Sequence, residues 1–344
     1  MPRLLTSARW VRVMATLCAA SVVVLIGALQ FGATRIDIGT VLAAIRTWMT
    51  GGESTDTADT ILWQVRLPRI LLAFLAGGGL AAVGVALQAL LRNALADPYV
   101  LGVSSGAALG VALAMLFGWG ITIGLAPTLP AFGFIGSVLT LGLLYRLART
   151  HVRLPVQSLL LAGVILNAIL TALIMFITSI MEPNRAAGLM AWLMGSLGGP
   201  GAGMLTTIAV AVVAGVLLLM RQASILNLLT LGEETARSLG VQTERAKARV
   251  FLIAALLTGA VVSVSGMIGF VGMIVPHAVR LVLGSDHRLL VPASALVGGM
   301  FLVLADTVAR TLLAPAELPV GVVTALAGGP FFLYILLGRK AQMA

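Results

Sequence analysis

Apolar stretches close to the length of a membrane-spanning helix recur along the whole chain. A helix crosses the hydrocarbon core of a bilayer with roughly 20 predominantly apolar residues, and the sequence contains ten such stretches. The eighth is shorter than the others, as expected of a partial or broken span. The pattern predicts an all-α polytopic membrane protein with about ten transmembrane helices, near residues 13–32, 70–91, 99–118, 121–144, 154–181, 204–220, 250–268, 270–283, 289–313 and 319–338.

The composition excludes a soluble globule. Of the 344 residues, 60% are hydrophobic and 10% are charged, so the polar side chains are too few to cover a water-soluble fold of this size. No Pro/Ser-rich linker or low-complexity run divides the sequence. We therefore expect a single transmembrane domain over residues 1–344, embedded in a lipid bilayer.

Basic residues are distributed unevenly between alternate connections of these helices. With the N-terminus inside, all but six of the 22 Lys and Arg residues fall in inner segments, and such an excess is typical of cytoplasmic loops. Both termini are therefore expected in the cytoplasm. The net charge of +10 is then mainly a topology signal, and no nucleic-acid partner is expected. The six outer residues are Arg35, Arg46, Arg66, Arg69, Arg185 and Arg310.

Motifs of enzymes and metal sites are missing from the sequence. A phosphate-binding loop needs a lysine after its glycines, but the two lysines, Lys247 and Lys340, stand in AKA and RKA. His151, His277 and His287 are far apart, and no zinc-protease or serine-hydrolase motif occurs. We expect no enzymatic activity, metal site or cofactor in this chain, with any ATP hydrolysis in a separate subunit.

Transport is the function class that remains, and two mechanisms compete. An ion-coupled secondary transporter places ionisable side chains in the membrane midplane, where a charge costs on the order of 3 kcal/mol. Asp97, Asp306 and Glu317 all lie near predicted span ends, which weakens this alternative. An ATP-driven importer instead needs a cytoplasmic segment that contacts its ATPase.

The segment LGEETARSLG, residues 231–240, has the features of such a contact. Thr230 and Glu233 have the spacing of a capping box, and Glu233 and Arg237 form an i,i+4 pair. Gly240 suits the position after the last helical turn. A short helix is therefore expected outside the membrane, within a coupling segment of about residues 221–249. A solvated connector helix explains the same spacing equally well.

Glycine and proline predict two interruptions of the helical pattern. Asp97 and Pro98, followed by a Gly/Ser run, suit a tight inner turn and a closely packed helix start. Gly266 and Gly272 precede Pro276, and this arrangement favours a break at which two helical pieces change direction.

Four stretches together resemble the permease subunits of type II ABC importers, the family that takes up ferric siderophores, haem and cobalamin. LGEETARSLGV resembles the coupling helix of that family. Ala94 departs from the family, whose members commonly have proline there. The other stretches, in the order of the family, are RLPR with GGGLAAVGVALQALLRNALADPYVLGVSSGAALG (66–110), GFVGMIVPHAVRLVLGSDHRLLVPASALVGGMFLVLADTVAR (269–310) and ELPVGVVTALAGGPFF (317–332).

The resemblance implies the type II ABC importer permease fold in a bacterial cytoplasmic (inner) membrane. It implies a homodimer around a central pathway, two cytoplasmic ATPase subunits and a periplasmic substrate-binding protein. The implied cargo is a bulky metal chelate. A ferric siderophore ranks first because it is the broadest class in the family, with haem and cobalamin as alternatives.

The resemblance also implies roles for charged residues at the two sides of the membrane. Coupling to the ATPase is assigned to Glu233, Glu234 and Arg237. Alternatives for the outer arginines are an ion pair of Arg310 with Asp306, and anchoring of RLPR at the membrane surface. Docking of acidic residues of the binding protein is assigned to Arg66, Arg69 and Arg310.

One face of the 154–181 stretch is a candidate for the translocation pathway. Small and polar residues recur there every four positions, which suits a pathway lining and helix packing equally. Gln157 and Ser158, at its inner end, lie in the region that resembles the cytoplasmic gate of the family. The face itself consists of Gly163, Asn167, Thr171 and Met175.

Overall fold

The computed structural model describes residues 5–32, 34–50, 57–119, 128–149 and 155–341, and in these ranges the chain forms helices joined by turns, without strands. His151 and the start of the expected span 121–144 lie outside the described residues. Since the described part is helical throughout, the expected all-α fold class is confirmed.

Each of the ten expected spans coincides with a helix. Seven helical segments are long and apolar enough to cross a membrane, counting residues 57–90 as one, and the other three spans coincide with the shorter apolar segments Val103–Leu116, Val271–Leu283 and Val320–Phe331. The ten helices are α1 (Ser7–Gln30), α4 (Leu67–Leu90), α5 (Val103–Leu116), α7 (Thr128–Ala148), α8 (Val156–Ile180), α10 (Ala202–Arg221), α13 (Thr243–Ser265), α14 (Val271–Leu283), α15 (His287–Thr311) and α16 (Val320–Ala341).

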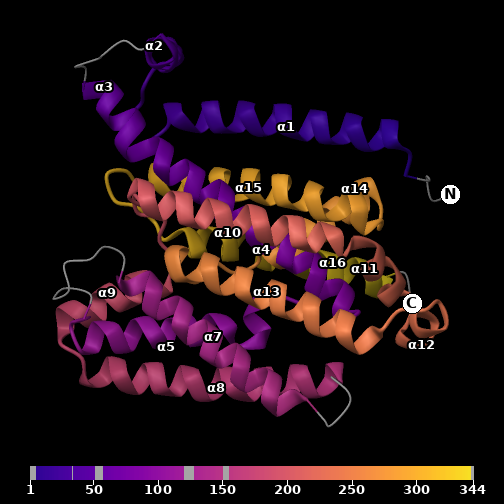
Figure 1. Cartoon of the computed structure of the whole chain (residues 1–344). Helices are drawn as coiled ribbons and strands as arrows, with labels where there is room; N and C mark the ends of the chain where they lie inside the picture. Colours follow the sequence, from indigo (N-terminus) through magenta and orange to yellow (C-terminus); the bar gives the residue numbers. More distant parts are fainter. Residues whose placement is uncertain (1–4, 33, 51–56, 120–127, 150–154, 342–344) are drawn as a thin grey trace.

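Most of the short helices lie at the two ends of this bundle (Figure 1). One end, the α12 end, carries the start of α1 and the end of α16, and the opposite end, the α9 end, carries α2 and α9 (Figure 1). The short helices are α2 (Ile38–Met49), α3 (Thr57–Thr60), η1 (Ile61–Arg66), η2 (Pro98–Leu101), α9 (Pro183–Leu193), α11 (Ala223–Thr230) and α12 (Glu233–Ser238).

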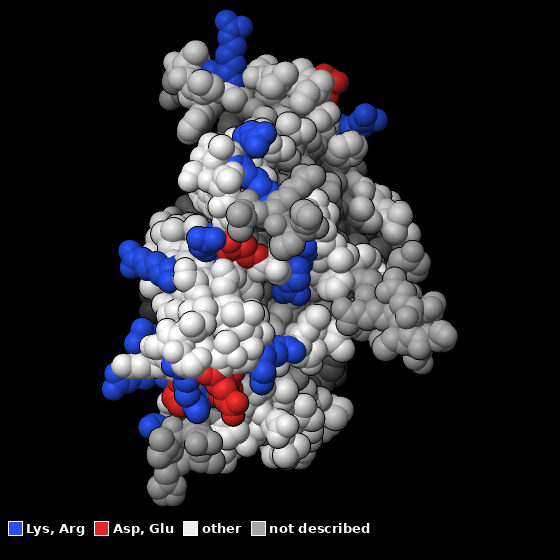
Figure 2. Space-filling model, turned by 90° about the vertical axis from the view of Figure 1, so that its right-hand side faces the viewer, with Lys and Arg blue, Asp and Glu red and all other residues white. Residues whose placement is uncertain are grey.

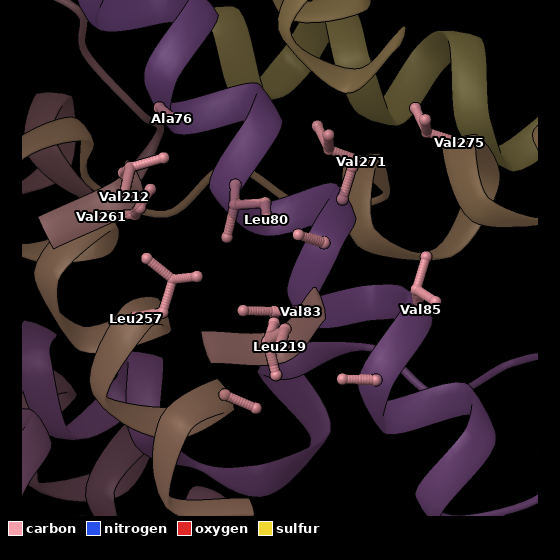
Figure 3. Packing of buried hydrophobic residues seen from close by; sticks show 14 of the residues in the cluster. Ala76, Leu80, Val83, Val85, Val212, Leu219, Leu257, Val261, Val271 and Val275 are labelled. Carbon is pink, nitrogen blue, oxygen red and sulfur yellow. The ribbon is translucent and has the colours of Figure 1, made fainter. Parts of the chain in front are cut away.

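Helix α4 runs through the centre of the molecule. Every residue from Ala76 to Leu90 is buried, as expected for a helix that is apolar on all sides. It packs against α10, α13, α14 and α15. Figure 3 shows Leu80 and Val83 of α4 among side chains from three of these helices. Helices α5, α7 and α8 form a second group beside α13 (Figure 1).

Glycines let the backbones of α4 and its neighbours touch. A Cβ atom at Gly77 would lie 2.2 Å from the carbonyl oxygen of Gly298 in α15, and one at Gly84 would lie 1.8 Å from that of Gly272 in α14. Small residues allow this close approach between membrane helices. Side chains at these positions would therefore push α15 and α14 away from α4.

Helix α1 lies along one edge of the bundle and is attached mainly to the last third of the chain (Figure 1). It packs against α15. The guanidinium group of Arg9 donates a hydrogen bond to the carbonyl of Leu283 at 2.8 Å, and the indole of Trp10 donates one to the carbonyl of Arg288 at 3.2 Å. Much of its remaining surface is exposed.

Both expected interruptions are present. Helix α13 ends at Ser265 and α14 begins at Val271, and Gly266 between them has a left-handed φ of 67°. A Cβ atom at Gly266 would lie 2.2 Å from the carbonyl oxygen of Trp192, so this turn also holds α9 in place. The break therefore separates two helices that run in different directions.

The turn after α4 contains a half-buried carboxyl group. The backbone N–H of Tyr99 donates a hydrogen bond of 2.9 Å to Asp97 Oδ1, and Gly102, with a φ of 74°, ends the following turn of 3₁₀-helix. Burial raises the pKa of Asp97 from 3.8 to about 6, although the Tyr99 hydrogen bond opposes the shift. The folded chain therefore favours the protonated form of this group.

Replacing Gly77 by alanine is expected to destabilise the bundle, because the added methyl group overlaps the backbone of α15. Overpacking of this kind costs about 1–3 kcal/mol. Thermal unfolding of the purified chain in detergent measures the effect. Gly27→Ala is the matched control, because a Cβ atom at Gly27 meets nothing within 4 Å. Equal melting temperatures for the two variants would contradict close contact of α4 with α15.

Asp97→Asn is expected to raise stability at neutral pH, because it keeps an acceptor for Tyr99 and removes a buried charge. Since burial raises the folded pKa, the contribution of Asp97 is fully present below about pH 4 and is lost as the pH rises through about 6. With a shift of about two pKa units, the variant should gain about 3 kcal/mol at about pH 7.5 and nothing below about pH 4. Denaturation followed at both pH values tests this, and an equal gain at both would reject the explanation by burial.

Candidate functional site

The start of α12 differs from the sequence prediction. Helix α11 ends at Thr230, whose hydroxyl donates a hydrogen bond of 2.7 Å to the carbonyl of Asn227. The chain then turns at Gly232, with a φ of 118°, and Glu233 is the first residue of α12. The expected capping box of Thr230 with Glu233 is therefore wrong, because the glycine begins a new helix between the two residues.

The other end of α12 follows the prediction. Gly240 has a left-handed φ of 85°. Its N–H donates a hydrogen bond of 2.9 Å to the carbonyl of Arg237, and the N–H of Val241 donates one of 3.0 Å to the carbonyl of Ala236. These two bonds form the Schellman motif that commonly ends a helix at glycine. The short helix outside the bundle thus ends in a defined cap, and its residue Ala236 is fully buried.

Ion pairs fasten α12 to the first turn of α13. Lys247 is 3% exposed, and its Nζ lies 3.1 Å from Glu233 Oε2 and 2.9 Å from Glu244 Oε1. Arg237 lies 3.4 Å from Glu244 and 3.8 Å from Glu233. The expected pair of Glu233 with Arg237 is therefore present, but it is the longest of the four. Lys247 was not assigned a role from the sequence, although its i+3 spacing from Glu244 is a signal for this cluster.

A polar groove of about 630 Å³ adjoins α12. The three residues assigned to ATPase coupling line it, together with Val156 and Gln157 from the start of α8. Glu234 is exposed, and the apolar side chains of Leu231 and Leu239 are exposed on either side of α12. Figure 2 shows this end of the molecule, where Lys and Arg side chains are spread widely among small groups of Asp and Glu.

The arginines assigned to docking lie at the α9 end and are paired within the chain. Arg69 lies 2.9 Å from Asp306 and 2.8 Å from Glu317, and Arg310 lies 2.9 Å from Asp306. Asp306 is fully buried. The pair of Arg310 with Asp306, the structural alternative drawn from the sequence, is therefore present.

Arg66 contacts the backbone at the end of α1. It is 4% exposed and donates hydrogen bonds to the carbonyls of Leu29, at 2.6 Å, and Thr34. Arg310 is equally buried and also donates to the carbonyl of Phe31. This geometry favours a structural role for Arg66 and Arg310. Arg69 is partly exposed and its partner Glu317 is half-exposed, so this pair reaches the surface.

The candidate pathway face of α8 divides into two environments. A Cβ atom at Gly102 would lie 3.4 Å from the carbonyl oxygen of Gly163, and the side chain of Asn167 is hydrogen-bonded to Ser105. Gly163 and Asn167 therefore contact the start of α5. The other two members of the face, Thr171 and Met175, are exposed. At the inner end of the helix, Gln157 is exposed and Ser158 is half-buried.

Histidines do not form a metal site within the described ranges, where no three His, Cys, Asp or Glu side chains gather in a way that could hold an ion. His287 Nδ1 lies 2.7 Å from Asn227 Oδ1. The amide of Asn227 also donates a hydrogen bond of 2.9 Å to Asp286, which caps α15. These contacts join α11 to the start of α15 at the α12 end.

Comparisons with known proteins cover nearly the whole chain. The hemin transport system permease protein HmuU of Yersinia pestis is 42% identical over 328 residues, which are 93% of this chain and 94% of HmuU. The cobalamin import system permease protein BtuC of Halobacterium salinarum is 43% identical over 287 residues, 83% of this chain and 76% of BtuC.

A solved structure supports the same relationship. It is described as an inward-facing conformation of a metal-chelate type ABC transporter, and it matches with a TM-score of 0.83 and 31% identity over 95% of this chain and 99% of its own. The expected importer permease fold is thus confirmed. A model of the FecCD transport family matches residues 11–338, a range that contains both ends of the bundle described above. The chain therefore belongs to the FecCD transport family.

Proposed function

We propose that the chain is the permease subunit of an ATP-driven importer that moves a bulky metal chelate from the periplasm to the cytoplasm. Two copies would form the pathway, with two cytoplasmic ATPase subunits and a periplasmic binding protein. The observation that carries the proposal is α12, a short helix held against α13 by a buried lysine at an end of the bundle where many Lys and Arg side chains lie on the surface (Figure 2). That distribution supports an α12 end in the cytoplasm.

The contacts of α12 suit the transmission of movement. A partner that binds Glu234 and the neighbouring leucines would contact a helix whose position is fixed by Lys247 and Arg237. Because Lys247 lies near the start of the long helix α13, displacement of α12 would be transmitted to a helix that packs directly on α4. The groove beside α12 includes Gln157, so the same movement would reach the start of α8.

The cargo is a metal chelate with three candidate classes. Ferric siderophores rank first from the sequence, whereas HmuU and BtuC are named for hemin and cobalamin. Uptake into proteoliposomes that contain the permease, its ATPase and the binding protein should be measured with all three classes. Uptake driven by a proton or sodium gradient in proteoliposomes of this chain alone would instead support a secondary transporter.

Ala236→Pro is expected to abolish coupling. It removes the N–H that bonds the carbonyl of Gly232 at 2.9 Å, and proline inside a helix costs about 3 kcal/mol. Co-purification of the ATPase, or ATP hydrolysis stimulated by cargo, should be lost while the membrane helices stay folded. Ala187→Pro, the same change in exposed α9, is the matched control and should leave ATPase assembly intact. Normal uptake by Ala236→Pro would show that α12 is only a connector.

Arg69→Gln is expected to weaken binding-protein docking several-fold and to reduce its dependence on salt, because Arg69 is the most exposed of the three arginines. Glu317→Gln should have the opposite effect, because it removes a carboxylate that competes for Arg69. Arg66→Gln and Arg310→Gln should mainly lower the melting temperature of the permease.

Affinity of the binding protein for the reconstituted complex, measured at low and high salt, distinguishes these roles. Co-purification of the ATPase serves as the control for folding of each variant. If Arg69→Gln keeps both the affinity and the salt slope of the wild type, the arginine cluster has only a structural role.

A further inference from the structure

A groove of about 470 Å³ lies between α7 and α13, away from the coupling segment and the arginine cluster. Its walls are mainly apolar and come from both helices. Leu139 and Leu143 of α7 and Leu252 of α13 are exposed at or beside it. Both helices are candidate membrane spans, so these side chains would face lipid. The lining residues include Val138, Leu141, Gly142, Phe251, Leu252 and Leu256.

The end of the groove nearest the α12 end is basic and aromatic. Tyr145 and Arg249 line it, and the guanidinium group of Arg149 lies 5.6 Å from the centre of the Tyr145 ring. Arg149 and Arg249 are exposed. Among the described residues neither forms an ion pair, whereas Glu244 at the start of α13 is paired with Lys247 and Arg237. Two cations without carboxylate partners thus stand at one end of an apolar groove.

These dimensions fit one acyl chain of a membrane lipid. The groove extends along α13 from Arg249 to Leu256, a distance of about 10 Å along the helix axis. This length covers most of the ~15 Å of hydrocarbon in one leaflet of the bilayer. Basic pockets between membrane helices on the cytoplasmic side suit phosphate-bearing head groups. A free phosphate or an acidic peptide would leave the apolar part of the groove unfilled.

We infer that this groove is a binding site for an anionic phospholipid, with an acyl chain between α7 and α13 and the head-group phosphate at Arg149 and Arg249. The lipid contacts α13 two residues beyond Lys247, the residue that fastens α12. Binding of the lipid at this site would therefore act on α13, the helix to which α12 is fastened. Lipid binding by this chain can be measured without any assay of transport.

Native mass spectrometry of the full-length chain, purified from nanodiscs of phosphatidylglycerol or of phosphatidylcholine with the same acyl chains, tests the site. The wild type should retain phosphatidylglycerol in preference to phosphatidylcholine. The double variant Arg149→Gln/Arg249→Gln should lose affinity for phosphatidylglycerol by about fivefold for each arginine. Gly142→Leu should also lose the lipid, because it fills the groove at a position where a Cβ atom meets nothing within 4 Å.

The control variant Arg12→Gln/Arg221→Gln removes the same charge from exposed positions away from the groove. It should retain the wild-type amount of phosphatidylglycerol. Three results would overturn the inference: no preference for phosphatidylglycerol in the wild type, equal losses in the two double variants, or full retention by Gly142→Leu. The last would show that the head group adsorbs to surface arginines without an acyl chain in the groove.

Discussion

Burial of α4 on every side from Ala76 to Leu90 is the constraint on which the other helices depend. A helix that contacts protein all around leaves no place for lipid or water along its length, so its neighbours must enclose it. Gly77 and Gly84 bring the backbones of α15 and α14 into direct contact with it. The close approach fixes the distances between these helices, and charged side chains are confined to the ends of the enclosed helix.

At each end of the bundle, one buried charged side chain forms ion pairs with two side chains of opposite charge and so positions the candidate contact surface. Lys247 lies between two glutamates at the α12 end, and Asp306 lies between two arginines at the α9 end. A buried ion costs several kcal/mol unless it is paired, so each cluster favours one arrangement of its helices. Because α13 and α15 both pack on α4, the two surfaces are oriented relative to a common core.

The long helices could be predicted from the sequence because hydrophobic length alone determines a span, and Gly240 marked the end of α12 because few other residues adopt a left-handed φ. Contacts between distant segments could not be predicted in this way. Burial of Arg66 depends on carbonyls more than 30 residues away. The capping box failed because Gly232 started a new helix after Thr230, and spacing alone does not distinguish one helix from two.

The attachment of α1 has a consequence for biosynthesis. Its main partner, α15, is separated from it by more than 250 residues, so Arg310, which bonds the carbonyl of Phe31, is synthesised long after α1. Helix α1 must therefore remain in the bilayer without its final contacts while most of the chain is inserted. The surface of α1 is mostly apolar, so the helix can remain in lipid before these contacts form. Packing of α1 against α15 can then occur only after the helices between them have been synthesised.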